Sequence, residues 1–440
     1  MSRLRRGSPA LIRDLNRSAV LALIGSQGPV ARVEIARRLS LSAATVTEVT
    51  RELVTEGLIR VVDQAASSGG RRPLLLGLVA EAAHALGVKV SPDRIAIVEV
   101  NLDGDILTQN ETPIDALGPE ALGRLVKVLR SAVEAADGTR LLGIGLGVPG
   151  TVDAQTGVVN APILGWNSIE LGQALRDQIG LPVLIDNDVN TLAIAERLYG
   201  HGRAAENFLT VTIGRGVGLG IVVGGDVYRG ARGGAGEFGH VPIVENGPSC
   251  ECGMRGCLEA LVADPALVAQ AVDAGLLTAG VSINDGTAAL RALADGGDEA
   301  AQRIFGDAGA ILGRAVAGLV NVLSPQVVIV SGEGAQAWAH MAPTFTAALD
   351  AATFPSLRGV KLEVDPWDDA KWASGAAALV LRATFAAPLY ERQIEDSVRA
   401  RLNGMGPRPH ADGHDAADDD SAAPVAVPFT NVGEREGITG

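Results

Sequence analysis

The 440-residue chain has few aromatic residues, few cysteines and no long apolar run. Phe, Trp and Tyr make up 3% of it, so we expect a core of aliphatic side chains and alanine, with many tight turns at its 55 glycines. No apolar run reaches the length of a membrane span, and residues 1–6 lead into no apolar segment of the signal type. These absences predict a soluble cytoplasmic protein with no membrane partner. The length predicts two or three domains.

Lysine is absent from the first 78 residues, yet that segment is basic. It contains 12 Arg against 6 Asp and Glu, a charge of +6, and because the whole chain carries −14, the remaining 362 residues carry −20. A basic head on an acidic body is typical of a DNA-binding module joined to a domain that does not bind DNA. The alternative is a head whose arginines only keep the chain soluble.

Residues 1–80 are predicted to form a winged helix-turn-helix domain. Apolar residues recur at helical spacing in three segments, residues 11–23, 33–39 and 42–53. Two strands are predicted on either side of a loop at residues 63–72, namely Ile59–Val62 and Pro73–Leu78. Three helices followed by a hairpin form this motif, and its third helix enters the major groove.

We expect the third helix and the wing to contact DNA. Ser42, Thr45 and Thr47 in the first turns of the helix would read base edges, and Arg71 and Arg72 at the wing tip would contact phosphates or enter the minor groove. Those first turns contain neither Arg nor Lys, so base reading would depend on hydroxyl and apolar contacts, which are weaker than arginine on guanine. A winged helix that binds another protein is the alternative.

Residues 81–390 alternate apolar strands with amphipathic helices, which predicts an α/β body in two lobes. The predicted strands are Ile95–Val100, Leu142–Val148, Val183–Ile185, Phe208–Ile213, Leu219–Val223 and Val327–Val330. The predicted helices are Pro119–Ala135, Ile169–Ile179, Val189–Tyr199, Pro265–Ala274 and Ala300–Leu323. Residues 404–440 are rich in Asp, Ala, Pro and Gly and are predicted to form a disordered acidic tail.

The chain's three cysteines, Cys250, Cys252 and Cys257, lie within eight residues, and nine residues separate His240 from the first of them. Three thiolates and one imidazole complete the tetrahedral ligand set of a structural Zn²⁺. In a cytosolic chain this clustering favours a metal site over a disulfide framework. The alternative is three buried thiols beside an unrelated histidine.

The segment from Glu237 to Glu259 resembles the signature of the ROK family of sugar repressors and sugar kinases. It has the pattern E-x-G-H, then C-x-C-G-x-x-G-C, then a further Glu. Other matching segments are Gly147–Gly150, Gly165–Asn167, Asp186–Asn190, Thr212–Gly218, Gly230–Ala231 and Gly375–Ala378. The head, with Ala44–Val46 and Gly69–Pro73, is similar to the winged head of the family's repressor branch.

This resemblance implies an actin-like, RNase-H-like two-lobed sugar-kinase fold with the sugar held between the lobes. By their positions in the matching motifs, the sugar-binding residues would be Asn187, Asp188, Glu237, His240 and Glu259. Carboxylates, an amide and an imidazole suit a sugar because its hydroxyls both donate and accept hydrogen bonds. His240 would place one ring nitrogen on zinc and the other on the sugar.

In family members that are kinases, the Asp at the position of Asp188 is the general base that deprotonates the attacking hydroxyl. The nucleotide side departs from the kinase pattern. Lys89 stands where the acid of the family's D-x-G-x-T turn belongs, Pro92 removes a backbone donor, and Glu333 would repel a nucleotide phosphate. We therefore predict a regulator, most simply a repressor of carbohydrate genes, that binds a sugar or sugar phosphate and has no enzymatic activity.

Two alternatives stay open. A sugar kinase, or a bifunctional kinase and regulator, is motivated by Asp188 and by the partly retained glycine loop at residues 214–218. A metal-responsive regulator is motivated by the three thiolates. In the preferred hypothesis a homodimer or homotetramer binds a double-stranded operator, and sugar changes the angle between the lobes and the spacing of two heads.

Overall fold

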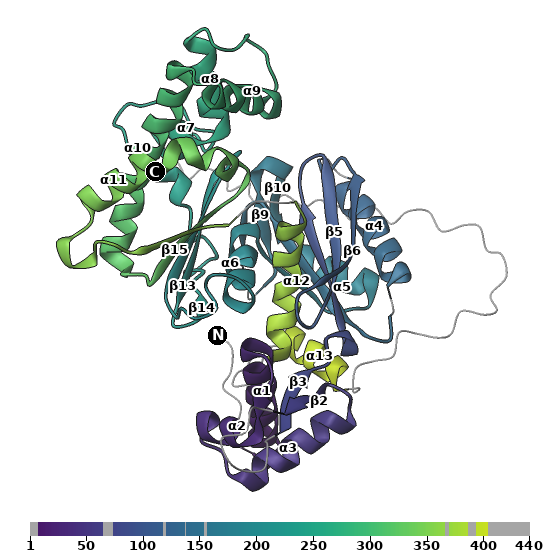
Figure 1. Ribbon diagram of the computed structural model, residues 1–440. Helices are drawn as coiled ribbons and strands as arrows, with labels where there is room; N and C mark the ends of the chain where they lie inside the picture. The colour runs from purple at the N-terminus through teal and green to yellow at the C-terminus, as the bar shows by residue number, and fades with distance from the viewer. Residues whose placement is uncertain are drawn as a thin grey trace, which may run out of the picture. The chain divides into compact units, whose positions relative to one another are not determined.

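A computed structural model of the protein (Figure 1) describes residues 8–64, 74–117, 120–136, 138–153, 156–365, 369–385 and 393–403. The chain divides into two compact units, residues 1–191 with 372–440, and residues 192–371. Arg71 and Arg72 of the predicted wing and the predicted tail at 404–440 lie outside the described residues. The domain boundaries expected at residues 80 and 390 stay predictions.

The head of the first unit consists of three helices and a small antiparallel sheet of order β1-β3-β2. The helices are α1 (Pro9–Gln27), α2 (Arg32–Leu39) and α3 (Ala43–Thr55), and the strands are β1 (Val30–Ala31), β2 (Ile59–Gln64) and β3 (Leu74–Leu78). The three predicted helices and the two hairpin strands are confirmed. The structure adds β1, which pairs with β3 and is too short to produce a periodic pattern in the sequence.

Local capping and a shared core explain why these residues form the head. Ser8 and Ser42 are the N-caps of α1 and α3, and each hydroxyl accepts a hydrogen bond from a first-turn backbone N–H. The turn between α2 and α3 passes through Ser40 in a left-handed conformation. The apolar residues buried together are Val20, Leu21, Leu23, Ile24, Val30, Ile35, Val46, Val49, Leu53, Leu58, Ile59 and Leu76.

The rest of the first unit is built on a five-stranded sheet of order β11-β7-β4-β5-β6. Its strands are β4 (His84–Val90), β5 (Arg94–Asn101), β6 (Ile106–Pro113), β7 (Leu141–Val148) and β11 (Val183–Asn187). Strand β5 is antiparallel to its neighbours β4 and β6, while β7 is parallel to β4 and β11 is parallel to β7. A smaller sheet contains β8 (Thr151–Val152), β9 (Val159–Ala161) and β10 (Trp166–Ile169).

Four helices accompany this sheet: α4 (Ala121–Ala135), α5 (Leu171–Ile179), α12 (Asp369–Phe385) and α13 (Gln393–Leu402). Helix α12 packs directly on β4 and β7, because a Cβ atom on Gly87 or Gly145 would clash with backbone carbonyls of α12. Strand β6 and helix α12 were not predicted from the sequence. Strand β6 is almost entirely exposed, and α12 is rich in alanine buried on several sides, so neither has the periodicity of a half-buried element.

The second unit is built on another five-stranded sheet, of order β14-β13-β12-β15-β16. Its strands are β12 (Phe208–Ile213), β13 (Val217–Val223), β14 (Asp226–Val227), β15 (Val327–Ser331) and β16 (Lys361–Val364). The helices are α7 (Glu259–Val262), α8 (Asp264–Asp273), α9 (Ile283–Asp295), α10 (Glu299–Leu323) and α11 (Trp338–Ala352), and α6 (Asp188–Leu198) begins in the first unit and ends in this one. Two sheets with accompanying helices confirm the predicted α/β body.

Helix α10 is long and apolar enough to cross a membrane by length and composition alone. Core helices of soluble proteins pass the same test, and Phe305, Leu312 and Val316 of α10 are fully buried in the apolar core of the second unit.

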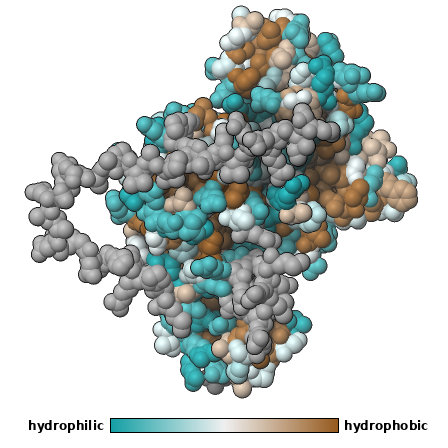
Figure 2. Space-filling model, turned by 180° about the vertical axis from the view of Figure 1, so that it is seen from behind, coloured by the Kyte–Doolittle hydropathy of each residue, from teal (hydrophilic) through white to brown (hydrophobic). Residues whose placement is uncertain are grey.

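The surface seen in Figure 2 mixes hydrophilic and hydrophobic residues. Two large apolar side chains of the second unit are exposed: Val322 is 81% accessible and Phe354 is 64% accessible.

Candidate metal centre and sugar-binding residues

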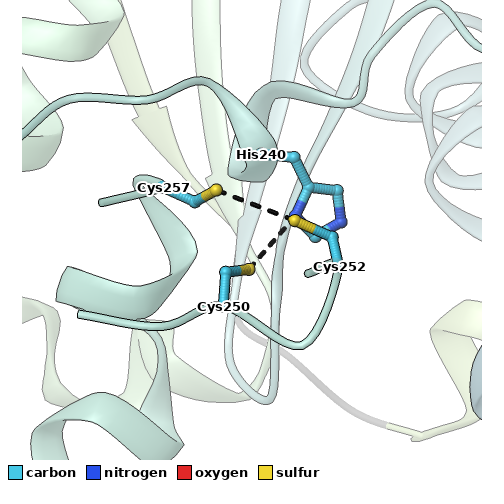
Figure 3. A group of neighbouring side chains, drawn as sticks. All are labelled: His240, Cys250, Cys252 and Cys257. Carbon is cyan, nitrogen blue, oxygen red and sulfur yellow. Dashed lines mark hydrogen bonds between the residues drawn. The ribbon is translucent and has the colours of Figure 1, made fainter. Parts of the chain in front are cut away.

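The four predicted metal ligands come together in the second unit (Figure 3). The ligand atoms of His240, Cys250, Cys252 and Cys257 all lie within 4.8 Å of one another. Cys250 Sγ is 3.5 Å from His240 Nδ1, and Cys252 Sγ is 3.8 Å from Cys257 Sγ. His240 ends a short 3₁₀ helix at Phe238–His240, and the cysteines belong to the loop that leads into α7.

These distances fit a tetrahedral metal ion. With Zn–S bonds of about 2.3 Å and a Zn–N bond of about 2.0 Å, two sulfurs of a tetrahedron lie about 3.8 Å apart, and sulfur and nitrogen lie about 3.5 Å apart. The two ligand pairs measured above have these separations. The donor set of three thiols and one imidazole therefore fits a divalent cation of the zinc type by its chemistry, and two of its six ligand pairs have the separations of a tetrahedral site.

The loop that carries the cysteines depends on glycine. Gly253 and Gly256 have φ values of +88° and +68°, and a Cβ atom on Gly256 would clash with the carbonyl of Val244. The N–H of Gly253 donates to the carbonyl of Cys250, and the N–H of Cys250 donates to the carbonyl of Met254. These turns fold the C-x-C-G-x-x-G-C segment back on itself, which brings its three thiols to one point.

The thiols differ in their electrostatic environment. Burial raises the pKa of Cys250 to about 12 and also raises the pKa of Cys257, whereas a hydrogen bond from the backbone of Met254 lowers the pKa of Cys252. Ionised thiols at the two buried positions therefore need a compensating positive charge. A divalent cation among the four ligand atoms would supply that charge.

Two carboxylates flank His240, one beside each ring nitrogen. Glu259 Oε1 is 3.9 Å from Nδ1, and Glu237 Oε2 is 3.9 Å from Nε2. The other oxygen of Glu259 accepts a hydrogen bond of 3.1 Å from the backbone N–H of Val217. The structure thus brings the predicted residues Glu237, His240 and Glu259 together, with Nδ1 facing Cys250 and Nε2 facing away from the metal ligands.

The predicted residues Asn187 and Asp188 belong to the first unit, where β11 ends and α6 begins. The Asn187 side chain is largely committed to backbone groups. Its Oδ1 accepts from the N–H groups of Val189 and Asn190, and its Nδ2 donates to the carbonyl of Gly150 at 3.0 Å. Asn187 therefore caps α6, and its amide has one N–H left for a ligand.

Asp188 is paired with Lys89, a contact that was not predicted from the sequence. Its Oδ2 forms an ion pair with Lys89 Nζ on β4, and the two side chains are only 11% and 15% exposed. Lys89 Nζ also lies over the ring of Trp372 in the first turn of α12, 4.8 Å from its centroid. In the sequence Lys89 is a departure from the kinase pattern, but its partner is 99 residues away and no local pattern indicates the contact.

The retained glycine loop after β12 lies next to acidic side chains. A Cβ atom on Gly214 would clash with the carboxylate of Glu333, and the carbonyl of Gly214 accepts from the N–H of Asp264 at 2.8 Å. Burial, and secondarily the charge of Glu333, raises the pKa of Asp264 to about 6. Two carboxyl groups, those of Glu333 and Asp264, therefore lie at this end of β12 beside the loop.

The predicted DNA-reading hydroxyls lie at the start of α3. Ser42 Oγ accepts from the N–H of Thr45 and is 2.8 Å from Thr45 Oγ1, and Thr47 Oγ1 donates to the carbonyl of Ala43 at 2.7 Å. Ser42 and Thr47 are exposed, and Thr45 is partly exposed. Arg37 on helix α2 is also exposed, was not among the predicted DNA-binding residues, and forms an ion pair of 2.6 Å with Glu34.

Comparison with known proteins agrees with this architecture. The ROK family model matches residues 85–383, and a MarR family model matches residues 15–64 of the head. The DNA-binding transcriptional dual regulator NagC of Escherichia coli (strain K12) is 29% identical over 399 residues, which are 89% of this chain and 98% of that protein.

Two solved structures are similar to the chain over different lengths. A ROK family transcriptional regulator described as a homologue of the E. coli MLC protein has a TM-score of 0.74 and 26% identity, and the match covers 89% of this chain and 99% of that one. A ROK family glucokinase from Streptomyces griseus in complex with glucose and AMPPNP has a TM-score of 0.59 and 26% identity, and the match covers 68% of this chain and 99% of that one. The sugar-kinase-like body and the helix-turn-helix head predicted from the sequence are thus confirmed, and the chain belongs to the ROK family.

Proposed function

We propose that this protein is a sugar-responsive DNA-binding transcription regulator, most simply a repressor of carbohydrate genes. The observation that carries the proposal is a helix-turn-helix head with a core of its own, attached to a ROK family body. In this proposal Ser42, Thr45 and Thr47 read base edges while Arg71 and Arg72 contact the DNA backbone or minor groove. The partner is a double-stranded operator in the cytoplasm.

The effector is proposed to be a sugar or sugar phosphate bound by Asn187, Asp188, Glu237, His240 and Glu259. The free amide hydrogen of Asn187, the carboxylates and His240 Nε2 provide both donors and acceptors for hydroxyl groups. With Nδ1 turned toward Cys250, the second ring nitrogen of His240 is available to a ligand.

We propose that the protein does not phosphorylate this sugar. Lys89 pairs with the carboxylate of Asp188, so the group that serves as general base in related kinases already holds a cation. Glu333 and Asp264 place negative charge beside Gly214, in the glycine loop where the resemblance to kinases would put nucleotide phosphate. Turnover of ATP with a hexose at about 1 s⁻¹ or faster would contradict this part of the proposal.

A sugar kinase, or a bifunctional kinase and regulator, is the second candidate. Asp188 and the glycine loop are retained, and a ROK glucokinase matches the body of the chain. This candidate predicts ATP-dependent phosphorylation of a sugar that Asp188→Asn abolishes.

The metal centre is proposed to hold a structural Zn²⁺. His240, Cys250, Cys252 and Cys257 would be its four ligands, and zinc would supply a fixed positive charge that stabilises the buried thiolates and holds the loop and His240 in place. A metal-responsive regulator would instead lose and regain DNA binding as free zinc varies in the physiological range. Dialysis of the protein–DNA complex against buffered zinc separates the two hypotheses.

Self-association as a homodimer or homotetramer belongs to the same proposal, since operator binding by two heads requires it. The exposed Val322 and Phe354 are apolar surface of the kind that subunit contacts bury. Light scattering of the purified protein measures the state directly.

The test of the main proposal uses two titrations. Thermal shift with D-xylose, D-glucose, N-acetyl-D-glucosamine and N-acetyl-D-glucosamine 6-phosphate identifies a sugar that stabilises the fold. Fluorescence anisotropy then measures binding to a duplex that the protein has selected from a random pool, with and without that sugar, at two salt concentrations. We expect the sugar to change DNA affinity by about 5-fold or more. No sugar effect on either readout would contradict the proposal.

A further inference from the structure

Helix α12 connects the Lys89–Asp188 pair to the DNA-reading head within the first unit. It begins beside that pair and ends against the head, and its last two residues extend beyond residues 85–383, which the family model matches. Three sets of contacts define this connection: one at the start of the helix, one along its length and one at its end.

At its start, α12 is joined to the proposed sugar site through Trp372. Trp372 is only 7% exposed, and the ammonium of Lys89 lies over its ring, 4.8 Å from the ring centroid. The same ammonium pairs with Asp188. Lys89 therefore touches both a sugar-site carboxylate and the first turn of α12.

Along its length, α12 is held rigidly on the sheet. Gly87 on β4 and Gly145 on β7 let the backbone of α12 come so close that a single added Cβ at either glycine would clash with the carbonyl of Ala373 or Ala376. Ala373, Ala376 and Ala377 are completely buried. Such packing leaves no space for the helix to bend independently, so a displacement at one end moves the whole element.

At its end, α12 contacts the head. A Cβ atom on Gly25 of α1 would lie 3.5 Å from the ring of Phe385, and Phe385 packs against the apolar core of the head. Leu402 of α13 packs against the same core. Arg401 of α13 donates to the carbonyl of Leu141 at 2.9 Å and so fastens this helix to the start of β7.

We propose that α12 transmits sugar binding to the DNA-reading head, with the contact of Lys89 on Trp372 as its input and the contact of Phe385 on Gly25 as its output. The inference rests on the proposed function. A sugar hydroxyl that donates to Asp188 competes with Lys89 for the carboxylate, and the displaced ammonium changes its contact with Trp372. Because close packing keeps α12 from bending, a shift at Trp372 is passed along the whole helix to Phe385, and through Phe385 to α1 and the reading helix.

The experiment measures the two binding steps separately in the full-length protein. The sugar that shifts the melting temperature of the parent, among the four named above, is titrated by calorimetry, and DNA affinity is measured with and without it. Phe385→Ala is expected to leave the sugar dissociation constant within about twofold of the parent while the sugar effect on DNA affinity falls from about 5-fold or more to nearly none. Trp372→Leu is expected to abolish the sugar effect on DNA as well.

Two further variants complete the design. Phe385→Leu keeps an apolar side chain at the contact, so it protects against a loss of folding in the alanine variant, and it is expected to reduce the sugar effect at least twofold. Leu107→Ala, at an exposed leucine of β6 with no part in either proposed binding site, is the control and keeps the parent's sugar effect.

A sugar effect of parental size in Phe385→Ala, or in Phe385→Leu if the alanine variant does not fold, overturns the role of α12 while the proposed function stands. A parent protein that binds DNA and sugar without any effect of one on the other contradicts the proposed function itself.

Discussion

Removal of the cation beside Asp188 is the sharpest stability test of the first unit. Lys89 and Asp188 are 15% and 11% exposed, so water screens the pair little, and loss of one partner leaves a buried charge that costs about 3–5 kcal/mol. Lys89→Met should therefore destabilise the unit by at least about 3 kcal/mol, or lower its melting temperature by about 6–12 °C. Asp188→Asn leaves the ammonium unpaired and should also be destabilising.

The double variant separates the ion pair from simple packing. Lys89→Met combined with Asp188→Asn removes both charges, so its loss of stability should be smaller than the sum of the two single losses by about 1–3 kcal/mol. Lys127→Met, at an exposed lysine of α4, is the matched control and should stay within about 0.5 kcal/mol of the parent.

Differential scanning calorimetry on all four variants and the parent provides the measurement. A melting temperature of Lys89→Met within about 2 °C of the parent, or strict additivity in the double variant, would refute the argument that this pair is buried and coupled.

Three further predictions concern the metal centre, a buried acid and the seat of α12. Cys257→Ser should reduce bound zinc from about one ion per chain to near zero by plasma mass spectrometry, and retention of zinc would exclude Cys257 as a ligand. Since burial raises the pKa of Asp264 from 3.8 to about 6, ionising it costs the folded state stability as pH rises through this window. Asp264→Asn should therefore stabilise the protein at pH 8 by up to about 3 kcal/mol and little at pH 4, and a gain equal at both pH values would contradict the cause. Gly145→Ala should lower the free energy of unfolding, measured in urea, by about 1–3 kcal/mol or more, because its Cβ would clash with Ala376. Gly123→Ala, with open space around it on α4, should raise that free energy by about 0.5–1 kcal/mol. Equal effects of the two substitutions would contradict close packing at Gly145.

Features that depend on residues close together in the chain were predictable. The candidate metal site could be recognised because Cys250, Cys252 and Cys257 belong to one loop and only nine residues separate His240 from Cys250, so spacing already limits their geometry. The head could be recognised because each helix has its own apolar stripe and α3 has its own N-cap, Ser42. Apolar periodicity and helix caps involve only neighbouring residues, so they can be recognised in the sequence without knowledge of the tertiary contacts.

Helix α12 and the hydrogen bonds of Asn187 could not be predicted from the sequence. Helix α12 returns from the C-terminal region to cover β4 and β7, and its buried alanines produce no amphipathic period. Asn187 was assigned to the sugar by its motif, and the structure adds that most of its hydrogen-bonding capacity caps α6. That commitment follows from the strand-to-helix turn, which a motif does not describe.

The sequence by itself determined the family, the winged head, the α/β body and the cluster of one histidine and three cysteines that could hold a metal, because each depends on short-range spacing and periodicity. Only the tertiary structure decided what Lys89 does. In the sequence it is a lysine in place of an expected acid, and in the fold it is the partner of Asp188 and the support of Trp372. The same holds for Phe385, which meets Gly25 from the far end of the chain. Such contacts arise only when β4, α6 and α12 pack, since no local pattern encodes which distant side chains a shared core brings together.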